Sequence, residues 1–431
     1  MGVGKILSVV RDFCVTVGLL NPDGTLPSSG GGSTPVTWDI TVSDEASLQT
    51  AITAGQSVLV DTSFSLTGLI ALPGASTPTR IGLQTGVEIT GTINGFFSTN
   101  GVDYDVTFDC APGSKFINGT SNHFIQGGIT ADSWIRGKLI QETFGADFLS
   151  DTFPALMEME LFDLTISGVT ANQYSRLGRG NIENAYIRGN NTVAGTFFYL
   201  SNIIHINRLD ISGTWPARTA YGVACLRLDS SAVIDDITWS ITQTGLLAAI
   251  FLNGGTIGNI SKDFQSGFAP RLDIAEGYVR GSLSSQTLLE ITLGNDADGD
   301  ITLVNCRMNL NSYTSNGSDR TYIIGCQVFA LNNSTIYNGV NFQNTNFQNA
   351  LAITDGYHRF NQCVFGNTVS ITGTAKPFQF VGCRFRNTIA IGAGVTDVMR
   401  FSACDFDGTV TDSSGIAQFV QCEPNSVNTI V

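Results

Sequence analysis

Apolar and polar residues recur in a fixed order from Leu303 to the end of the chain. The repeated pattern is six residues long, starts with an apolar residue and carries Cys or Thr at its fourth position. Its copies are LVNCRM, IIGCQV, FQNTNF, FNQCVF, FVGCRF, FSACDF and FVQCEP. Their fourth positions lie 18 to 21 residues apart. A period of this length is typical of a solenoid.

The spacing within each copy predicts β-strands. Apolar residues fall at alternate or third positions, in β-rich runs interrupted by Asn-Thr and Gly, instead of at the spacing of a helix. Cys383 and Phe385 should face the same side of a strand, with Phe380 across an irregular step. Coils stacked about 4.8 Å apart would then place Phe on Phe and Cys on Cys. We predict a parallel β-helix whose core ladder contains Phe342, Phe360, Phe380, Phe401, Phe419, Cys363, Cys383, Cys404 and Cys422.

The chain before these coils divides into three predicted parts. Residues 1–26 form an attachment segment, 27–36 a Gly/Ser/Pro linker, and 37–431 the β-helix, with its most regular coils in 301–431. Apolar residues of the first segment form a short heptad seam that could bundle several copies of the chain. These residues are Ile6, Val10, Phe13, Val17 and Leu20. The same segment also fits an alternating strand, and neither pattern is that of a secretion signal.

One helix is predicted at about residues 43–55. Ser43 can cap it, Asp44 and Glu45 lie in its first turn, and Gly55 can end it. Its apolar face is Leu48, Ala51 and Ile52. We expect this helix to cover the apolar end of the first coil. We expect the last coil to be covered by self-association into a homotrimer, since the sequence shows no second helix of this kind near Val431.

Composition narrows the classes of partner. The formal net charge is −14, and it lies in the first 300 residues, because acids and bases balance from Ile301 onward. A nucleic-acid groove needs a basic stripe, so we expect no nucleic-acid partner, and we expect no membrane partner either. The chain has nine cysteines. Stacked cysteines could form disulfides or bind a metal, but their place in one column favours reduced core thiols.

Two segments resemble a known family. SLQTAITAGQSVLVDTSFSLTGLIALPG, from Ser47, and GVEITGTING, from Gly86, are similar to the start of the pectate-lyase-like right-handed β-helix, above all to that of bacteriophage tailspike and fibre proteins. The resemblance implies a right-handed parallel β-helix, homotrimeric, that follows a small attachment segment and linker. It carries over no catalytic residue.

The candidate chemistry is sparse. A glycosidase needs two carboxylates beside a sugar-binding surface, and the candidate pairs are Glu158 with Glu160, Asp235 with Asp236, and Asp273 with Glu276. Solvated surface acids are the alternative for each pair. Trp134, Trp215 and Trp239 could stack on sugars or pack structurally. The carboxylates Asp296, Asp298 and Asp300 resemble part of a calcium loop but lack the distal Glu, which favours a solvated turn. We expect no cofactor and no metal.

Two functions fit these observations. The first is a structural spike or fibre of a phage particle, bound to a tail or capsid protein through residues 1–26 and recognising a polysaccharide of the host surface. The second is a tailspike depolymerase that cleaves that polysaccharide. The sequence favours the first, because no acidic pair falls in a catalytic motif.

Overall fold

A computed structural model of the protein describes residues 36–92, 95–99, 103–118, 124–126, 133–143, 158–169, 175–177, 179–190, 198–200, 204–214, 226–229, 231–241, 249–262, 271–283, 287–293, 300–312, 321–332, 340–353, 358–372 and 378–424. In parts of some strands only the backbone is described. The chain separates into residues 1–39 and a β-solenoid, 40–431. The attachment residues Ile6, Val10, Phe13, Val17 and Leu20 lie outside the described residues.

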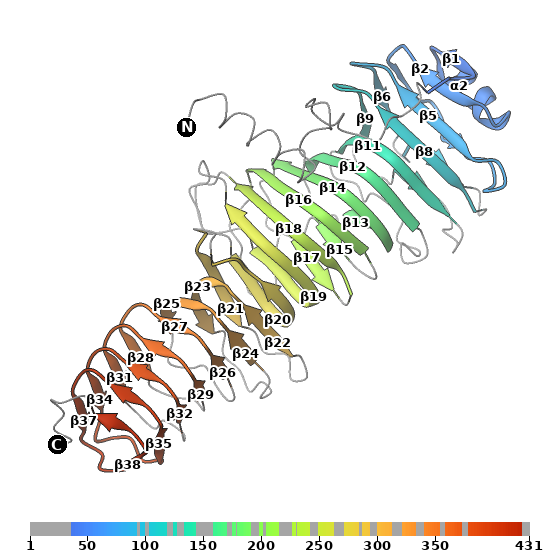
Figure 1. The fold of residues 1–431 in the computed structure, drawn as a ribbon. Coiled ribbons are helices and arrows are strands. Elements are labelled where there is room, and N and C mark those ends of the chain that lie inside the picture. Colours follow the sequence, from blue (N-terminus) through green and yellow to red (C-terminus); the bar gives the residue numbers. More distant parts are fainter. Residues whose placement is uncertain are drawn as a thin grey trace, which may run out of the picture. The chain divides into compact units, whose positions relative to one another are not determined.

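The solenoid is built on one long ladder of parallel strands, stacked in chain order (Figure 1). Each coil adds one strand, so the backbone hydrogen bonds of a coil are satisfied by the coils before and after it. The strands are β1 (Ile40–Val42), β2 (Ser57–Val60), β5 (Thr79–Leu83), β8 (Asp105–Cys110), β11 (Trp134–Thr143), β12 (Glu158–Val169), β14 (Arg179–Asn190), β16 (Ile204–Thr214), β18 (Val233–Ile241), β19 (Ala249–Lys262), β20 (Arg271–Arg280), β22 (Ile301–Val304), β24 (Thr321–Ile324), β26 (Val340–Gln343), β29 (His358–Asn361), β32 (Gln379–Val381), β35 (Met399–Ser402) and β38 (Ala417–Val420).

Shorter parallel ladders form the other sides of the coils. One contains β13 (Ser175–Leu177), β15 (Phe198–Leu200) and β17 (Leu226–Asp229), and it continues through parts of β19 and β20 into β21 (Leu289–Leu293), β23 (Arg307–Ser312), β25 (Gln327–Asn332), β27 (Asn346–Phe347), β30 (Val364–Phe365), β33 (Arg384–Phe385), β36 (Asp405–Phe406) and β39 (Glu423–Pro424). The others are β3 (Phe64–Ser65), β6 (Glu88–Thr90) and β9 (Lys115–Asn118), then β4 (Ile70–Ala71), β7 (Phe97–Ser98) and β10 (Ile125–Gln126), and finally β28 (Leu351–Ile353), β31 (Val369–Ile371), β34 (Ile389–Ile391) and β37 (Val410–Asp412).

The phenylalanines of the core ladder stack along the solenoid. Phe342, Phe360, Phe380 and Phe401 are buried, and each ring is stacked on the next at 4.7 to 5.0 Å. Phe347, Phe365, Phe385 and Phe406 form a second stack inside the same coils. The cysteines Cys363, Cys383 and Cys404 are buried beside them. Phe419 and Cys422, on the last described coil, are half-buried against this core.

The irregular step between the two phenylalanines is a tight corner. The residue before each Cys or Thr of the pattern has a positive φ, for example 50° at Asn344, 61° at Gly382 and 52° at Ala403. Its backbone N–H donates to the next coil, as Gly382 does to the Ser402 carbonyl at 2.9 Å. The corner therefore turns the chain inward without leaving its amide unsatisfied.

The cysteines are hydrogen-bond donors as well as core residues. The Cys383 thiol lies 3.3 Å from the Phe360 carbonyl of the preceding coil, and Cys404 lies 3.4 Å from that of Phe380. Thr345 occupies the same place and donates to the Ile323 carbonyl at 3.1 Å. The hydrogen bond between the Cys383 and Cys363 side chains, together with burial, raises the pKa of Cys383 to about 12. All described cysteines are free thiols, as predicted for the core column.

Aromatic packing also fills the first coils. Phe96, Phe97, Phe108, Phe116 and Phe124 are buried together, with ring centroids 5.2 to 6.3 Å apart and mostly tilted or edge-to-face. The periodic pattern does not predict this cluster, because its members come from strands of different sides of the coil.

The predicted helix is present as α2 (Glu45–Thr53), and Leu48, Ala51 and Ile52 are its buried residues. Its N-cap is Asp44, not Ser43, because the Asp44 carboxylate accepts the Ser47 N–H at 2.9 Å. Among the described residues, no helix has the length and hydrophobicity of a membrane-spanning segment.

Side chains of α2 pair with the edge of β4. The Gln49 amide accepts the Ala71 N–H at 2.8 Å and donates to the Ala71 carbonyl at 3.2 Å. The Glu45 carboxylate accepts the backbone N–H groups of Thr67 and Gly68. The two Gln49 bonds satisfy backbone groups of β4, the last strand of its ladder, and the Glu45 bonds satisfy backbone groups just before it.

Candidate ligand-binding groove

The corner continues upstream of the Cys column as a four-residue unit whose first residue is buried. In β18 the unit is Ile234 to Ile237, in which both isoleucines are buried and Asp235 and Asp236 are exposed between them. The following coils carry Ile257 to Ile260 and Val279 to Ser282 in register, since Ile257 pairs with Ile234 and Val279 pairs with Ile257. The two middle positions of each unit thus form outward columns along the stack.

A surface groove of about 760 Å³ crosses these columns on β18, β19 and β20 and on residues that directly follow β20 and β22. Its lining is polar and is made of Asp235, Asp236, Thr256, Gly258, Asn259, Tyr278, Arg280, Gly281, Ser282, Leu283 and Asn305. These four strands are consecutive members of the long ladder (Figure 1). The groove therefore lies on the face of the solenoid that the long ladder forms.

Two glycines make room for the groove. Gly258 follows Asp235 along one column, and a Cβ there would lie 2.0 Å from the Asp235 carbonyl oxygen. A Cβ on Gly281 would lie 2.9 Å from the Asn305 carbonyl oxygen and 3.0 Å from the Cys306 sulfur. The preceding coil at Gly258 and the following coil at Gly281 approach too closely for a larger residue. Thr256 and Asn259 of β19 also line the groove, on the strand between its two walls.

The two walls have opposite charge. Asp235 and Asp236 stand on β18, whereas Arg280 and Tyr278 stand on β20, two coils further on. Two strand spacings place the Cα atoms of Asp235 and Arg280 roughly 9 to 10 Å apart. His205 on β16 lies outside the groove lining and contacts Asp235, with its Nε2 atom 2.8 Å from the carboxylate. Among the described residues, Arg280 forms no ion pair.

Of the predicted acidic pairs, Asp235 and Asp236 are the one pair that the described part of the chain places in the groove. Glu276 is exposed on β20 and is not part of the lining. The backbones of Glu158 and Glu160 lie in β12 and that of Asp273 lies in β20, while their side chains lie outside the described part of the chain. The calcium-like candidates Asp296 and Asp298 also lie outside it, and Asp300 is exposed.

The predicted tryptophans do not provide a sugar-stacking surface in this groove. Trp239 is buried, with 1% of its surface exposed, and it packs in the core. Trp134 is half-buried, and the Arg136 guanidinium lies 4.5 Å from its ring centre. Trp215 lies outside the described residues. The aromatic residue of the groove is Tyr278, which the sequence analysis did not single out.

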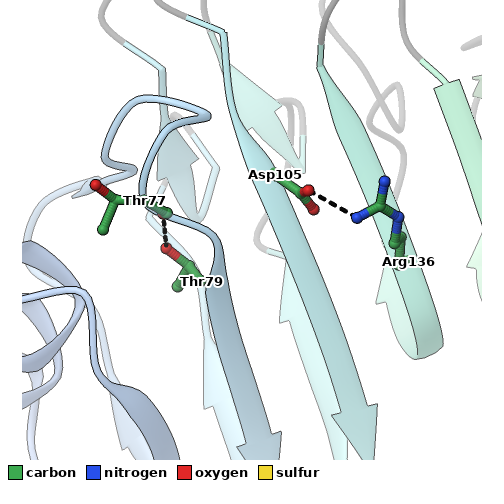
Figure 2. Close-up of polar contacts among 4 residues, drawn as sticks. All are labelled: Thr77, Thr79, Asp105 and Arg136. Carbon is green, nitrogen blue, oxygen red and sulfur yellow. Dashed lines mark hydrogen bonds and ion pairs between the residues drawn. The ribbon is translucent and has the colours of Figure 1, made fainter.

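The outer surface of the first coils differs from the groove because its charges are paired between coils. Figure 2 shows Arg136 of β11 against Asp105 of β8, at 2.7 Å, and the Thr79 hydroxyl donating to the Thr77 carbonyl at 3.4 Å. Arg80 of β5 is likewise 3.1 Å from Asp109 of β8. Such partly exposed pairs contribute about 1 kcal/mol or less to stability and leave little charge for a ligand.

No described group of three or more His, Cys, Asp or Glu side chains has the arrangement of a metal site. The groove can form hydrogen bonds and ion pairs with a ligand. Carboxylates accept on one wall, a guanidinium donates on the other, and Asn259 and Asn305 can do both.

Comparisons of the chain with protein-family models, with curated proteins and with solved structures found no match.

Proposed function

We propose that this protein is a structural spike or fibre of a bacteriophage particle that binds a polysaccharide of the host surface in the groove between Asp235 and Arg280. The groove carries the proposal. It is open, elongated across several coils and lined by carboxylates, a guanidinium, amides and a tyrosine, which suit a ligand rich in hydroxyl groups. The phage context rests on the resemblance of the segments that start at Ser47 and Gly86 to tailspike and fibre proteins.

The arrangement of acids favours binding over hydrolysis. A glycosidase places its two carboxylates on either side of the bond that is cleaved. Asp235 and Asp236 are consecutive residues of one wall, and the opposite wall presents Arg280. A ligand in the groove therefore meets both acids from the same side.

Several further features belong to the same proposal. The solenoid is right-handed. The helix α2 is its cap, which is supported by the bonds of Gln49 to β4 and of Glu45 to the backbone just before β4. The mature protein is a homotrimer, attached through residues 1–26 to a tail or capsid protein, and it acts at the host surface as part of the virion. Cofactors play no part in this function.

A depolymerase is the second candidate, and the contact between His205 and Asp235 favours it. An imidazole 2.8 Å from one carboxylate, with Asp236 alongside, provides groups that can exchange protons with a bound sugar. Release of reducing ends from a bound polysaccharide, and its loss in Asp236→Asn, would establish this activity in place of simple binding.

The proposed function is tested by binding of the full-length protein to an array of bacterial surface polysaccharides. We expect at least one polysaccharide to bind, and Arg280→Ala to weaken binding roughly tenfold or more, since a charge-assisted hydrogen bond contributes about 1.5 to 3 kcal/mol. Arg400→Ala is the matched control, because Arg400 is an exposed arginine of the same ladder outside the groove. No binding to any polysaccharide, or equal loss in both variants, would contradict the proposal.

A further inference from the structure

A second groove of about 320 Å³ lies further along the same ladder, over β24, β26, β29 and β32. It runs between two outward columns of side chains. The first column is Tyr322, Asn341, Arg359 and Gln379, and the second is Ile324, Gln343, Asn361 and Val381. The inward-facing Phe342 and Phe360 alternate with these columns, so their backbone forms the floor.

The chemistry of this amide groove differs from that of the first groove. None of the described residues that line it is Asp or Glu, four of them carry side-chain amides, and Arg359 is its one charged residue. Gln343 and Asn361 are exposed, and Tyr322 is 41% exposed at one end. An amide donates and accepts at once, which matches pairs of neighbouring hydroxyls, and an exposed tyrosine ring offers a flat apolar surface.

The two grooves follow one another on one face. Tyr278 lines the first and Tyr322 the second, and both belong to one column, because Thr302 pairs with Tyr278 on one side and with Tyr322 on the other. The two tyrosines are therefore two coils apart, roughly 9 to 10 Å between Cα atoms. An extended polymer that lies along the stack can contact both.

We propose that the amide groove is a second subsite that holds further hydroxyl-bearing sugar units of the polysaccharide bound in the first groove. This inference rests on the proposed function and adds to it the class of unit and the direction of the bound chain. The charged walls of the first groove select a unit there, while the amides of the second contact hydroxyls of the units that follow along the stack.

The test uses the full-length protein and fragments of increasing length prepared from whichever polysaccharide the array identifies. For the wild type, affinity should rise with fragment length until both grooves are filled. In Tyr322→Ala and Gln379→Ala, long fragments should bind at least fivefold more weakly, while the shortest fragments that bind should bind as they do to the wild type. Gln418→Ala is the matched control, because Gln418 is an exposed glutamine of the same column beyond the groove.

The outcomes separate the two levels of the proposal. If no polysaccharide binds the wild type, the proposed function fails and the subsite with it. If long fragments bind both variants as tightly as the wild type, the subsite is wrong while the first groove stands. If the variants instead change the molar mass of the protein in light scattering, the amide groove is an interface between copies of the chain, and the subsite is again wrong.

Discussion

The rings of Phe360 and Phe380 are stacked face to face, with centroids 4.8 Å apart and planes 5° from parallel. Their backbones are register partners on β29 and β32, so the spacing of the strands sets the spacing of the rings. Phe380 also meets Phe385 of the second stack edge-on, at 5.5 Å and 65°. The Phe380 ring thus contacts the coils on both sides of it and the second phenylalanine stack within its own coil.

The position of Phe380 predicts a large loss of stability when its side chain is truncated. Phe380→Ala should destabilise the protein by about 3 to 5 kcal/mol, because a large cavity opens between two coils. Asn387→Ala removes an exposed side chain that accepts only the Thr388 N–H, and it should cost about 1 kcal/mol or less. Chemical denaturation of both variants measures the difference. Equal stabilities would place Phe380 outside the core.

The thiol column predicts a preference for a donor. Cys383→Thr should retain most of the stability, because Thr345 already serves at the equivalent corner with a hydroxyl donor. Cys383→Val has the shape of Thr without the hydroxyl, and it should be about 1 kcal/mol less stable than Cys383→Thr. The two variants are compared by denaturation under identical conditions. A valine variant as stable as the threonine variant would show that the thiol acts only as an apolar filler.

The corner predicts opposite effects of two reciprocal substitutions. Gly382 and Ala403 both occupy the left-handed region, at φ of 61° and 52°. Gly382→Ala should cost about 1 kcal/mol and Ala403→Gly should relieve part of a similar strain, since a Cβ in this region costs about 1 to 2 kcal/mol. The space at Gly382 is sufficient, because a Cβ there would have its nearest neighbour at 3.6 Å. Changes of the same sign in the two melting temperatures would exclude backbone strain as the cause.

The periodic part of the fold could be predicted from the sequence because every copy of the pattern repeats the same burial. Phe360 and Phe380 are equivalent residues in equivalent coils, and stacking follows from the period alone. The cluster around Phe108 and Phe116 could not be predicted in this way, since its rings come from different ladders. The N-cap of α2 could not be predicted either, because Ser43 and Asp44 both have suitable side chains. The local backbone selects Asp44.

The groove could be predicted only in part. Asp235 and Asp236 were recognisable as candidate acids, but their partner wall depends on the register of three coils. The sequence signal for the groove is the alignment of Ile234–Ile237 with the units that begin at Ile257 and Val279. These two units carry glycine at one middle position, Gly258 in the first and Gly281 in the second. Because these units lack the Cys of the later coils, the alignment becomes evident only from strand pairing.

Acid should weaken the last described coils through Asp412. Burial by itself would raise the pKa of this carboxyl, but hydrogen bonds from Ser414, Ala417 and Gly415 outweigh it and hold the pKa below its usual value of 3.8. A lowered pKa means that the stabilising contribution is present above about pH 4 and is lost as the pH falls through the folded-state pKa. The Asp412→Asn variant should therefore melt below the wild type near neutral pH, and the gap should close in acid.

Melting curves at about pH 7, 5 and 3 measure this gap. Asp405→Asn is the control, because Asp405 is an exposed acid of a nearby coil. A gap between wild type and Asp412→Asn that stays constant down to pH 3 would contradict the assigned role of the Asp412 carboxylate.

The central claim is that the coils stack in parallel register, since the core ladder and both grooves depend on it. Distances between paired spin labels test it most directly, in protein whose Cys14, Cys225 and half-buried Cys422 are replaced by serine and which is diluted with unlabelled chains. Labels at positions 322 and 418 are predicted to lie roughly 24 Å apart between Cα atoms, from five strand spacings, and labels at 302 and 418 about 5 Å further. Distances that do not lengthen by one strand spacing with the added coil would contradict the parallel stack.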